Sequence, residues 1–291
     1  MFIKPMLASL KTAEDATQEG YLFEKKYDGE RAIIEMTGQT RLIYARSGRE
    51  KSRMYPDLMI ETRLPCVLDG EIAAATGKFN DIQHRANREN GIKEAAKRYP
   101  VIFYPFDILF VDGVSVMHMP LSKRKEYLNK IMIATPNCII APTYTDEDLL
   151  WKLAQSQGWE GIIGKRMNSV YSPAARGSDW FKRKDKKRGE FWVIGYTAGI
   201  GWRESTFGAM ILAKFENELF VPVGEVGTGF DQRELEMLND KLKSHVRAFP
   251  WFNYPEPATW VQPFKVVVEY LELTNDGKIR FPAYKGVVPG Y

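Results

Sequence analysis

Two adjacent lysines, Lys25 and Lys26, end an apolar stretch and stand immediately before a turn signal, Asp28 and Gly29. An amine attacks an electrophile only when it is deprotonated, and a neighbouring cation together with desolvation lowers the pKa of a lysine. The turn would leave the Lys26 side chain at a pocket wall, where a phosphate could be presented to it. The stretch therefore predicts a nucleophilic lysine. The competing interpretation is an edge-strand lysine pair beside a hairpin turn, because short matches recur by chance.

A second group of cations lies in the run "KRKDKKR" at 182–188. Lys182 and Lys184 alternate by two, so they face the same side of a strand, where two ammonium groups can neutralise a phosphate under attack. Phosphoryl transfer asks a protein mainly for positioning and charge stabilisation, with Mg²⁺ completing the site. A further basic run at 46–53 favours a polyanionic partner, and a solvated charged surface is the alternative for each run.

Length and composition limit the classes of protein that need considering. The 291 residues, 44% of them hydrophobic, allow one large domain or two smaller ones. Two cysteines and three histidines without zinc spacing indicate a reducing compartment, no structural metal, and oxygen ligands for any metal that binds. The first 20 residues hold no apolar targeting core, and no window is long and apolar enough to cross a membrane. We therefore expect a cytoplasmic protein without membrane attachment.

Short β-type segments dominate the first two thirds of the chain. Runs rich in branched and aromatic residues, each ending in a turn residue, predict antiparallel strands; they lie at 20–29, 31–36, 41–46, 66–75, 101–113 and 161–167. Two helices are expected at 120–132 and 145–158, with Ser122 and Thr145 as their N-caps. These helices should pack on the sheets and position the charged stretches.

The pattern changes after the basic run. Strands are predicted at 190–201, 207–230 and 264–274, interrupted by one helix at 231–244. Asp231 and Glu234 have the spacing of a capping box. About 100 residues with this content match the size of a small OB-fold β-barrel. We therefore expect an α+β chain of two domains, 1–187 and 188–291.

The opening stretch also carries a family resemblance. "KYDG" at 26–29, followed by Arg31, resembles the adenylylation motif of ATP-dependent DNA ligases, which belong to the covalent nucleotidyltransferase superfamily with RNA ligases and mRNA capping enzymes. Five later stretches resemble the family's next motifs in order: "ARSGR" at 45–49, "LDGEI" at 68–72, "FYPFDILFVDG" at 103–113, "EGIIGK" at 160–165 and "WFKRK" at 180–184. "FNDIQHR" at 79–85 resembles a signature typical of the DNA ligases.

The resemblance implies a fold and an activity. Residues 1–187 would form a nucleotidyltransferase domain of antiparallel sheets flanked by helices, and residues 188–291 an OB-fold domain that closes over the substrate. The chain would act as a monomer that seals 5′-phosphate/3′-hydroxyl nicks in duplex DNA. Its three steps would be adenylylation of the enzyme by ATP, transfer of AMP to the 5′-phosphate, and attack by the 3′-hydroxyl. Such an activity would serve DNA repair, replication or recombination.

The resemblance also implies roles for individual residues. Lys26 would become the lysyl-AMP, with Lys182 and Lys184 assisting the transfer. Nucleotide contacts would come from Glu24 at the adenine edge, Phe106 stacked on the adenine, Arg31, Arg46 and Lys165 on ribose or phosphates, and Glu71 on the ribose or a metal. Glu160 would hold the divalent cation, Mg²⁺ or Mn²⁺. Each residue could instead be an ordinary core aromatic or a surface ion pair.

The sequence departs from larger family members in three ways. There is no room before Met6 for the additional DNA-binding domain, and the turn at 214–220 is too short for a latch insertion, so we expect nick binding by two domains that salt weakens strongly. The C-terminus offers only Arg280 and Lys285 to the leaving pyrophosphate, which predicts inefficient self-adenylylation. The alternatives are an RNA ligase, a GTP-using capping enzyme, and a catalytically idle nucleic-acid-binding protein.

Overall fold

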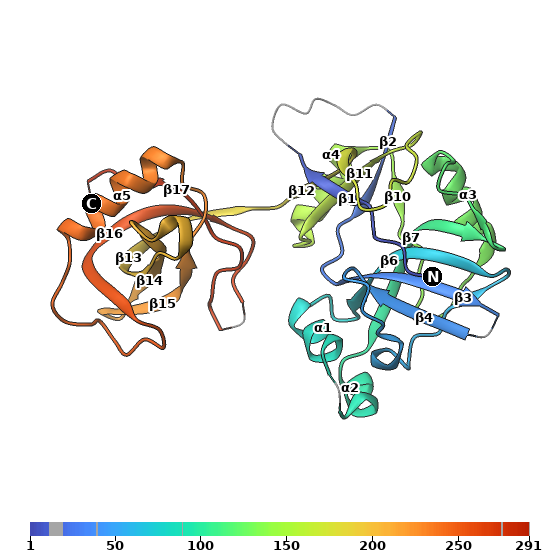
Figure 1. The fold of residues 1–291 in the computed structure, drawn as a ribbon, viewed down its shortest axis with the longest axis horizontal. Helices are drawn as coiled ribbons and strands as arrows, with labels where there is room; N and C mark the ends of the chain where they lie inside the picture. Colours follow the sequence, from blue (N-terminus) through green and yellow to red (C-terminus); the bar gives the residue numbers. More distant parts are fainter. Residues whose placement is uncertain (12–19, 39, 89, 275, 291) are drawn as a thin grey trace. The chain divides into compact units, whose positions relative to one another are not determined.

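The computed structural model describes residues 1–11, 20–38, 40–88, 90–274 and 276–290 (Figure 1). The chain divides into two compact units, Met1–Asp185 and Lys186–Tyr291, each with its own hydrophobic core. Both units are built mainly of sheets, with few helices. The expected α+β composition is therefore present.

One five-stranded sheet of the first unit joins segments that are far apart in the sequence. Its order is β1 (Leu7–Leu10), β12 (Arg176–Lys184), β11 (Gly161–Arg166), β2 (Tyr21–Lys25) and β10 (Thr143–Tyr144). The prediction of purely antiparallel sheets is wrong here, because β1 pairs with β12 in parallel. A parallel pair needs a long crossover connection, which the chain between these strands supplies.

The second five-stranded sheet of this unit is antiparallel. Its order is β4 (Thr40–Ala45), β3 (Glu30–Thr37), β6 (Cys66–Ala74), β7 (Val101–Val111) and β8 (Val114–Ser115). Its register places Arg31 of β3 opposite Glu71 of β6, and Ile33 opposite Asp69. Directly opposed residues point to the same face of a sheet, so this register brings two acidic side chains beside an arginine.

Short elements complete the first unit. They are the two-stranded ribbon of β5 (Glu61–Thr62) and β9 (Met132–Ile133), the 3₁₀ turn η1 (Ser52–Met54), and the helices α1 (Phe79–Ala86), α2 (Ile92–Arg98), α3 (Leu121–Ile131) and α4 (Glu147–Ser156). As expected for the two predicted helices, α3 packs on β7 and α4 packs on β2 and β11.

The predicted helix caps were both misplaced. The N-cap of α3 is Pro120, whose ring presets the backbone angle for the first turn, and Ser122 already lies inside the helix. The N-cap of α4 is Asp146, whose side chain accepts a hydrogen bond from the Leu149 backbone N–H at 2.9 Å. Thr145 lies one residue too early for that bond. The sequence "TD" contains two good capping residues, and only the fold decides between them.

The second unit contains one five-stranded antiparallel sheet and one helix. The strands, in sheet order, are β15 (Leu219–Val226), β14 (Phe207–Glu216), β13 (Lys187–Ala198), β16 (Ala258–Tyr270) and β17 (Ala283–Val287). The helix is α5 (Gln232–Ser244), and η2 (Gly201–Arg203) is a 3₁₀ turn between β13 and β14. The predicted capping box is confirmed, because the side chains of Asp231 and Glu234 each accept a hydrogen bond from the other's backbone N–H.

The β14–β15 connection is tight. Glu216 pairs with Leu219, and the two residues between them, Asn217 and Glu218, both have positive φ angles of 49° and 64°. Two residues in this conformation form the type of turn whose twist matches that of a hairpin. The described turn therefore holds no insertion, as the sequence predicted.

Two glycines, one immediately before β3 and one at the start of β11, permit close approach between strands. A side chain at Gly29 would place its Cβ 2.2 Å from the carbonyl oxygen of Ile72. A side chain at Gly161 would meet the carbonyl oxygen of Arg183 at 2.0 Å, and Gly161 also has a φ of +148°. Neither position has space for a methyl group, so the predicted turn glycine at Gly29 is required by contact with a neighbouring strand.

Two absences concern only the residues that the structure describes. Among them, no helix combines the length and apolar composition needed to cross a bilayer. Within the same ranges, no group of three or more histidine, cysteine or acidic side chains is arranged to hold a metal ion.

Candidate active site

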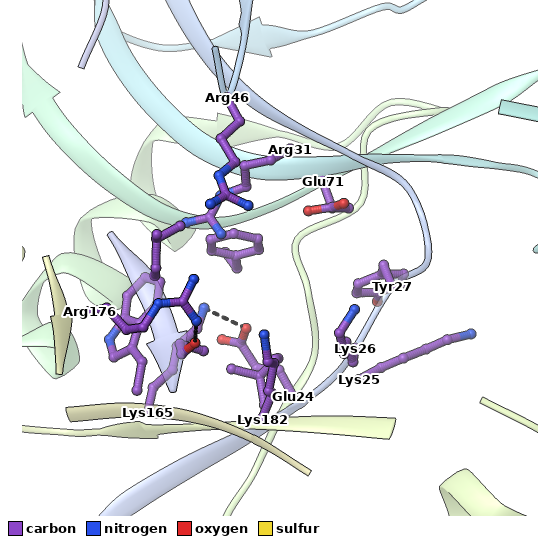
Figure 2. Close-up of a pocket in the computed structure, with 15 residues that line it drawn as sticks. Glu24, Lys25, Lys26, Tyr27, Arg31, Arg46, Glu71, Lys165, Arg176 and Lys182 are labelled. Carbon is purple, nitrogen blue, oxygen red and sulfur yellow. Dashed lines mark hydrogen bonds and ion pairs between the residues drawn. The ribbon is translucent and has the colours of Figure 1, made fainter. Parts of the chain in front are cut away.

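Both sheets of the first unit line a pocket of about 200 Å³ (Figure 2). Its lining includes eight of the residues predicted from the sequence: Glu24, Lys26, Arg31, Arg46, Glu71, Phe106, Lys165 and Lys182. These residues come from six strands and from the turns beside them. The fold thus brings together side chains that are up to 158 positions apart in the sequence, Glu24 and Lys182.

Strand alternation explains one wall of the pocket. Arg176, Trp180 and Lys182 lie two or four positions apart on β12, so they point to the same side, and all three line the pocket. Lys184 continues the same face, and its ammonium group lies 2.8 Å from a carboxylate oxygen of Glu160. The predicted shared orientation of Lys182 and Lys184 is consistent with these positions.

Lys26 lies directly after β2, at the end of the strand. Its backbone N–H donates to the carbonyl oxygen of Gly161 at 3.0 Å, and its ammonium group forms an ion pair with Glu160. We expected Lys25 to crowd this amine, but the Lys25 ammonium lies over the Trp159 ring, 4.7 Å from its centroid. In Figure 2 the Lys25 side chain points away from Lys26. The charged partner of Lys26 is therefore a carboxylate.

The cations near Lys26 come from β12 instead of β2. Burial lowers the pKa of Lys182, and the nearby charges of Lys184, Arg176 and Lys26 lower it further. Burial acts to raise the pKa of Glu160, but Lys26 and Lys184 outweigh it and hold that pKa below its ordinary value. Glu160 consequently stays ionised between two lysines. The sequence predicted that Lys25 and Lys26 would crowd each other. In the structure, the crowded cations are instead Lys26 after β2 and the cations of β12.

Arg31 is held by a carboxylate that the sequence analysis did not single out. Its Nε and Nη2 donate to the two oxygens of Asp69 at 2.6 and 2.7 Å, and Nη2 also donates to the carbonyl oxygen of Met6 at 3.1 Å. The Tyr171 hydroxyl donates to Asp69 at 2.6 Å. Asp69 is fully buried. This bidentate pair fixes the guanidinium group at the pocket wall.

Glu71 lies two positions from Asp69 on the same face of β6. Burial raises the pKa of Glu71 to about 7; the positive charges of Arg31 and Lys26 oppose this rise, and the negative charges of Asp69 and Glu160 add to it. The carboxyl group of Glu71 therefore binds a proton more readily than an ordinary glutamate. A cation bound nearby would favour its ionised form.

Glu24 is buried and paired with two lysines. Lys165 donates to Oε2 of Glu24 at 2.7 Å, and Lys125 of α3 donates to Oε1. The Lys165 ammonium also lies 3.7 Å from the centroid of the Phe106 ring and 4.4 Å from that of Trp180. Burial lowers the pKa of Lys165 to about 8, although Glu24 opposes this change.

Phe106 belongs to β7 and is almost completely buried. The guanidinium carbon of Arg31 lies 4.6 Å from its ring centroid, so the ring contacts a cation from each sheet. Its predicted stacking on a purine stays a prediction, as do the roles of the other site residues. Arg46 is exposed on the turn that follows β4 and lines the rim of the pocket.

Two predicted site residues belong to the second unit. Arg280 forms an ion pair with Glu272, and the Lys285 ammonium lies 3.9 Å from a carboxylate oxygen of Glu269. Glu269 also pairs with Lys186 at 2.6 Å. The predicted contact of Arg280 and Lys285 with a leaving pyrophosphate stays a prediction.

Several residues in or behind the pocket were missed by the sequence analysis. Tyr27, Arg176 and Trp180 line the pocket. Asp69 and Lys125 lie behind it and hold Arg31 and Glu24, which do line it. Alternation by two would have found Asp69 from Glu71, and Trp180 from Lys182. Tyr27 directly follows Lys26 in the sequence. Its ring stacks on Tyr104, with the ring centroids 3.8 Å apart. Lys125 gave no signal beyond a basic helix.

The strand-end lysine, the paired carboxylates and the converging cations have the chemistry that suits a phosphate-bearing ligand. The family model for the ATP dependent DNA ligase domain matches residues 5–184, and that for the ATP dependent DNA ligase C terminal region matches residues 203–289. The chain belongs to the ATP-dependent DNA ligase family.

Known relatives are similar over nearly the whole chain. The multifunctional non-homologous end joining protein LigD of Mycolicibacterium smegmatis is 33% identical over 98% of this chain, and a DNA ligase of Natronomonas pharaonis is 30% identical over 98%. The match covers 38% and 55% of those two proteins, so the chain spans about half or less of their length. A solved structure of mycobacterial DNA ligase D complexed with ATP and MES is 26% identical, with a TM-score of 0.55, over 99% of this chain and 96% of that one.

Proposed function

We propose that the chain is an ATP-dependent DNA ligase that seals 5′-phosphate/3′-hydroxyl nicks in duplex DNA. The observation that carries the proposal is the position of Lys26, at a strand end inside a pocket where cations of β3, β11 and β12 converge. An amine placed among phosphate-binding groups is suited to nucleotidyl transfer. Membership of the DNA ligase family and the likeness to a ligase that binds ATP support the same reaction.

In the first step, the Lys26 amine bonds to the α-phosphorus of ATP and displaces pyrophosphate, leaving a lysyl-AMP. The ion pair with Glu160 holds the amine in place before the substrate arrives. Attack needs the neutral amine, so this pair must be given up when ATP binds. Lys182 and Lys184 lie on the neighbouring strand and supply positive charge where the phosphate becomes more negative. The same cations assist the transfer of AMP to DNA and its final release.

A divalent cation, Mg²⁺ or Mn²⁺, fits the acidic groups of the pocket. Glu160 and Glu71 provide hard oxygen ligands, and Mg²⁺ is commonly held by one or two carboxylates together with substrate phosphates. Burial is the main cause of the raised pKa of Glu71, and a divalent cation bound there would favour the ionised carboxylate that can hold it. When bound, the metal would supply charge neutralisation to the reacting phosphates.

The remaining pocket residues bind the nucleotide in this proposal. Arg31, fixed by Asp69, and the exposed Arg46 contact ribose or phosphates, and Lys165 adds a further cation. Phe106 presents its ring to the adenine, and Glu24 meets the adenine edge. Each of these side chains lines the pocket.

We further propose a division of labour between two domains, 1–187 for nucleotidyl transfer and 188–291 as an OB-fold barrel. The strand and helix content of the second unit and the match to the ligase C-terminal region support this assignment. The OB domain closes over bound ATP, bringing Arg280 and Lys285 to the pyrophosphate, and later presents another face to nicked DNA. The protein acts as a monomer.

The deciding experiment is covalent labelling with α-labelled ATP and Mg²⁺, followed by a denaturing gel. Lys26→Ala should abolish labelling, because it removes the amine that bonds to the α-phosphorus. Lys25→Ala is the matched control and should keep most of the labelling, because the Lys25 ammonium lies over the rings of Trp159 and Tyr27. Stoichiometric labelling of Lys26→Ala would refute the assignment, and equal labelling by GTP would indicate a different nucleotidyltransferase. Sealing of nicked DNA in preference to nicked RNA completes the test.

A further inference from the structure

Lys125 is a buried cation of the first unit that neither the sequence motifs nor the proposed chemistry uses. It belongs to α3, its side chain is 8% exposed, and its ammonium group forms an ion pair with Glu24. Burying an amine costs free energy unless a partner compensates the charge. Lys125 does not line the pocket, so it contacts Glu24 from behind. That position suits a residue that orients another side chain.

The backbone of α3 is anchored so that Lys125 has little freedom. The neighbouring Arg124 is completely buried, and its guanidinium donates to both oxygens of Asp107 at 2.8 and 2.9 Å. The same group donates to the carbonyl oxygen of Ser169 at 2.9 Å. This bidentate pair ties the first turn of α3 to β7, and therefore fixes the point from which Lys125 reaches Glu24.

The two lysines donate to different oxygens of the Glu24 carboxylate. Lys125 occupies Oε1 and Lys165 occupies Oε2, the latter at 2.7 Å. A carboxylate oxygen has two acceptor positions, so each oxygen can still accept one further hydrogen bond. Burial would raise the pKa of Glu24, but Lys125 and Lys165 outweigh it and keep the group ionised. Glu24 therefore presents acceptors and no donor.

We propose that Lys125 sets the preference for adenine by holding Glu24 as an ionised acceptor for the exocyclic 6-amino group. This inference rests on the proposed function. Adenine donates a hydrogen bond from its 6-position, guanine presents a carbonyl oxygen there, and a carboxylate accepts the first and repels the second. A buried site that needs a donor from its ligand discriminates strongly against a ligand that lacks it. Lys125 is thus a positioning residue, acting through Glu24.

The test compares two nucleotides that differ only at the 6-position. ATP carries the amine, and purine riboside triphosphate carries hydrogen in its place. The parent should show a kcat/KM for self-labelling at least roughly tenfold higher with ATP. In Lys125→Met the ratio between the two nucleotides should fall at least roughly fivefold, mainly through a higher KM for ATP, with relatively more labelling by GTP. Intact-mass spectrometry identifies the nucleotide that is attached.

Two further variants make the result decisive. Lys125→Arg keeps the charge and should retain the parent's ratio within about threefold. Lys123→Met makes the same exchange at an exposed position of α3, where the lysine pairs only with Glu126 in this part of the structure, and should leave the ratio unchanged. A Lys125→Met protein that loses activity equally with both nucleotides would overturn the proposal, since that is the signature of a purely structural role. If Lys125→Met does not fold, a loss of preference in Lys125→Arg overturns it instead.

The proposed function and this inference fail in different ways. If the parent takes up label from no nucleotide, the proposed function is wrong. If the parent labels with ATP and Lys125→Met keeps the full preference for the 6-amino group, only the role of Lys125 is wrong.

Discussion

The two units of the molecule use charged residues in different ways. In the first unit, Glu24, Asp69 and Glu160 are buried, and each is paired with one or two cations around a single pocket. In the second unit, the pairs of Arg280 and Lys285 lie nearer the surface, and the outer face of the sheet is covered by aromatic side chains such as Trp251 and Trp260. Buried pairs are costly to break from one side, whereas exposed pairs contribute little.

Desolvated ion pairs and surface ion pairs are suited to different roles. Ion pairs that stay desolvated restrict side-chain geometry, which is what transfer of a phosphoryl group needs. Pairs at a surface leave side chains free to exchange partners when a substrate arrives. We therefore expect substitutions in the first unit to change the chemical step greatly, and substitutions in the second to change single steps or stability modestly.

After the loss of Lys26 itself, the largest effect should follow loss of Glu160. Glu160→Ala leaves Lys26 and Lys184 without their shared carboxylate and removes a metal ligand, so ATP labelling should fall at least about a hundredfold. Glu147→Ala is the matched control, because Glu147 also bridges two cations, Lys11 and Arg183, outside the pocket. Labelling by that control should stay within about threefold of the parent. Full activity of Glu160→Ala would remove this residue from the site.

The pH dependence of stability should reveal Glu71. The pKa of this carboxyl is about 7 in the folded protein and lies near 4.5 when unfolded, so the folded state holds an extra proton between those values. Stability must then fall as pH rises from about 4.5 to 7. Between pH 5 and 8, the unfolding free energy of the metal-free parent should drop by about 2 kcal/mol relative to Glu71→Gln. Urea titrations at several pH values measure this, and parallel profiles would contradict it.

The cations of the second unit should affect one step only. Arg280→Ala and Lys285→Ala should slow ATP labelling by roughly tenfold, because their proposed role is to stabilise the departing pyrophosphate. Single-turnover sealing of a nick that is already adenylylated should remain within about twofold. Equal losses in both assays would mean that the ion pairs with Glu272 and Glu269 serve folding or DNA contact.

The smallest effect should come from helix caps. Asp231→Ala removes one half of the capping box at the start of α5 and should lower the unfolding free energy of the second unit by about 1 kcal/mol. Thr145→Ala should change the stability of the first unit by only about 0.3 kcal/mol, because Asp146 caps α4. Urea unfolding followed by circular dichroism compares the two. A loss of about 1 kcal/mol or more in Thr145→Ala would indicate that Thr145, as the sequence predicted, caps α4.

Much of the fold was predictable from local patterns. Branched and aromatic runs marked the principal strands, and the box of Asp231 and Glu234 marked α5, because these signals depend on neighbouring residues. The sequence analysis missed α1 and α2, which are short and polar. It also missed the parallel pairing of β1 with β12, since register between distant strands has no local signal.

The candidate site was predictable in part for the same reason. Lys26, Glu160 and Lys182 were found because motifs list reactive groups along the chain. Their pairing was not found, since the Lys26–Glu160 contact joins residues 134 positions apart. The position of Lys125 depends on the anchoring of α3 by Arg124, which only tertiary structure defines.

The contacts at Gly29 and Gly161 limit how this protein can be re-engineered. A side chain at Gly29 or Gly161 would collide with a neighbouring backbone carbonyl. If a library designed to accept new nucleotides varied these two codons, most of its variants would misfold. Displacing those carbonyls would shift β6 or β12, and with them the reactive groups that the library is meant to keep. Diversity is better placed at Arg46, whose exposed side chain borders the cavity.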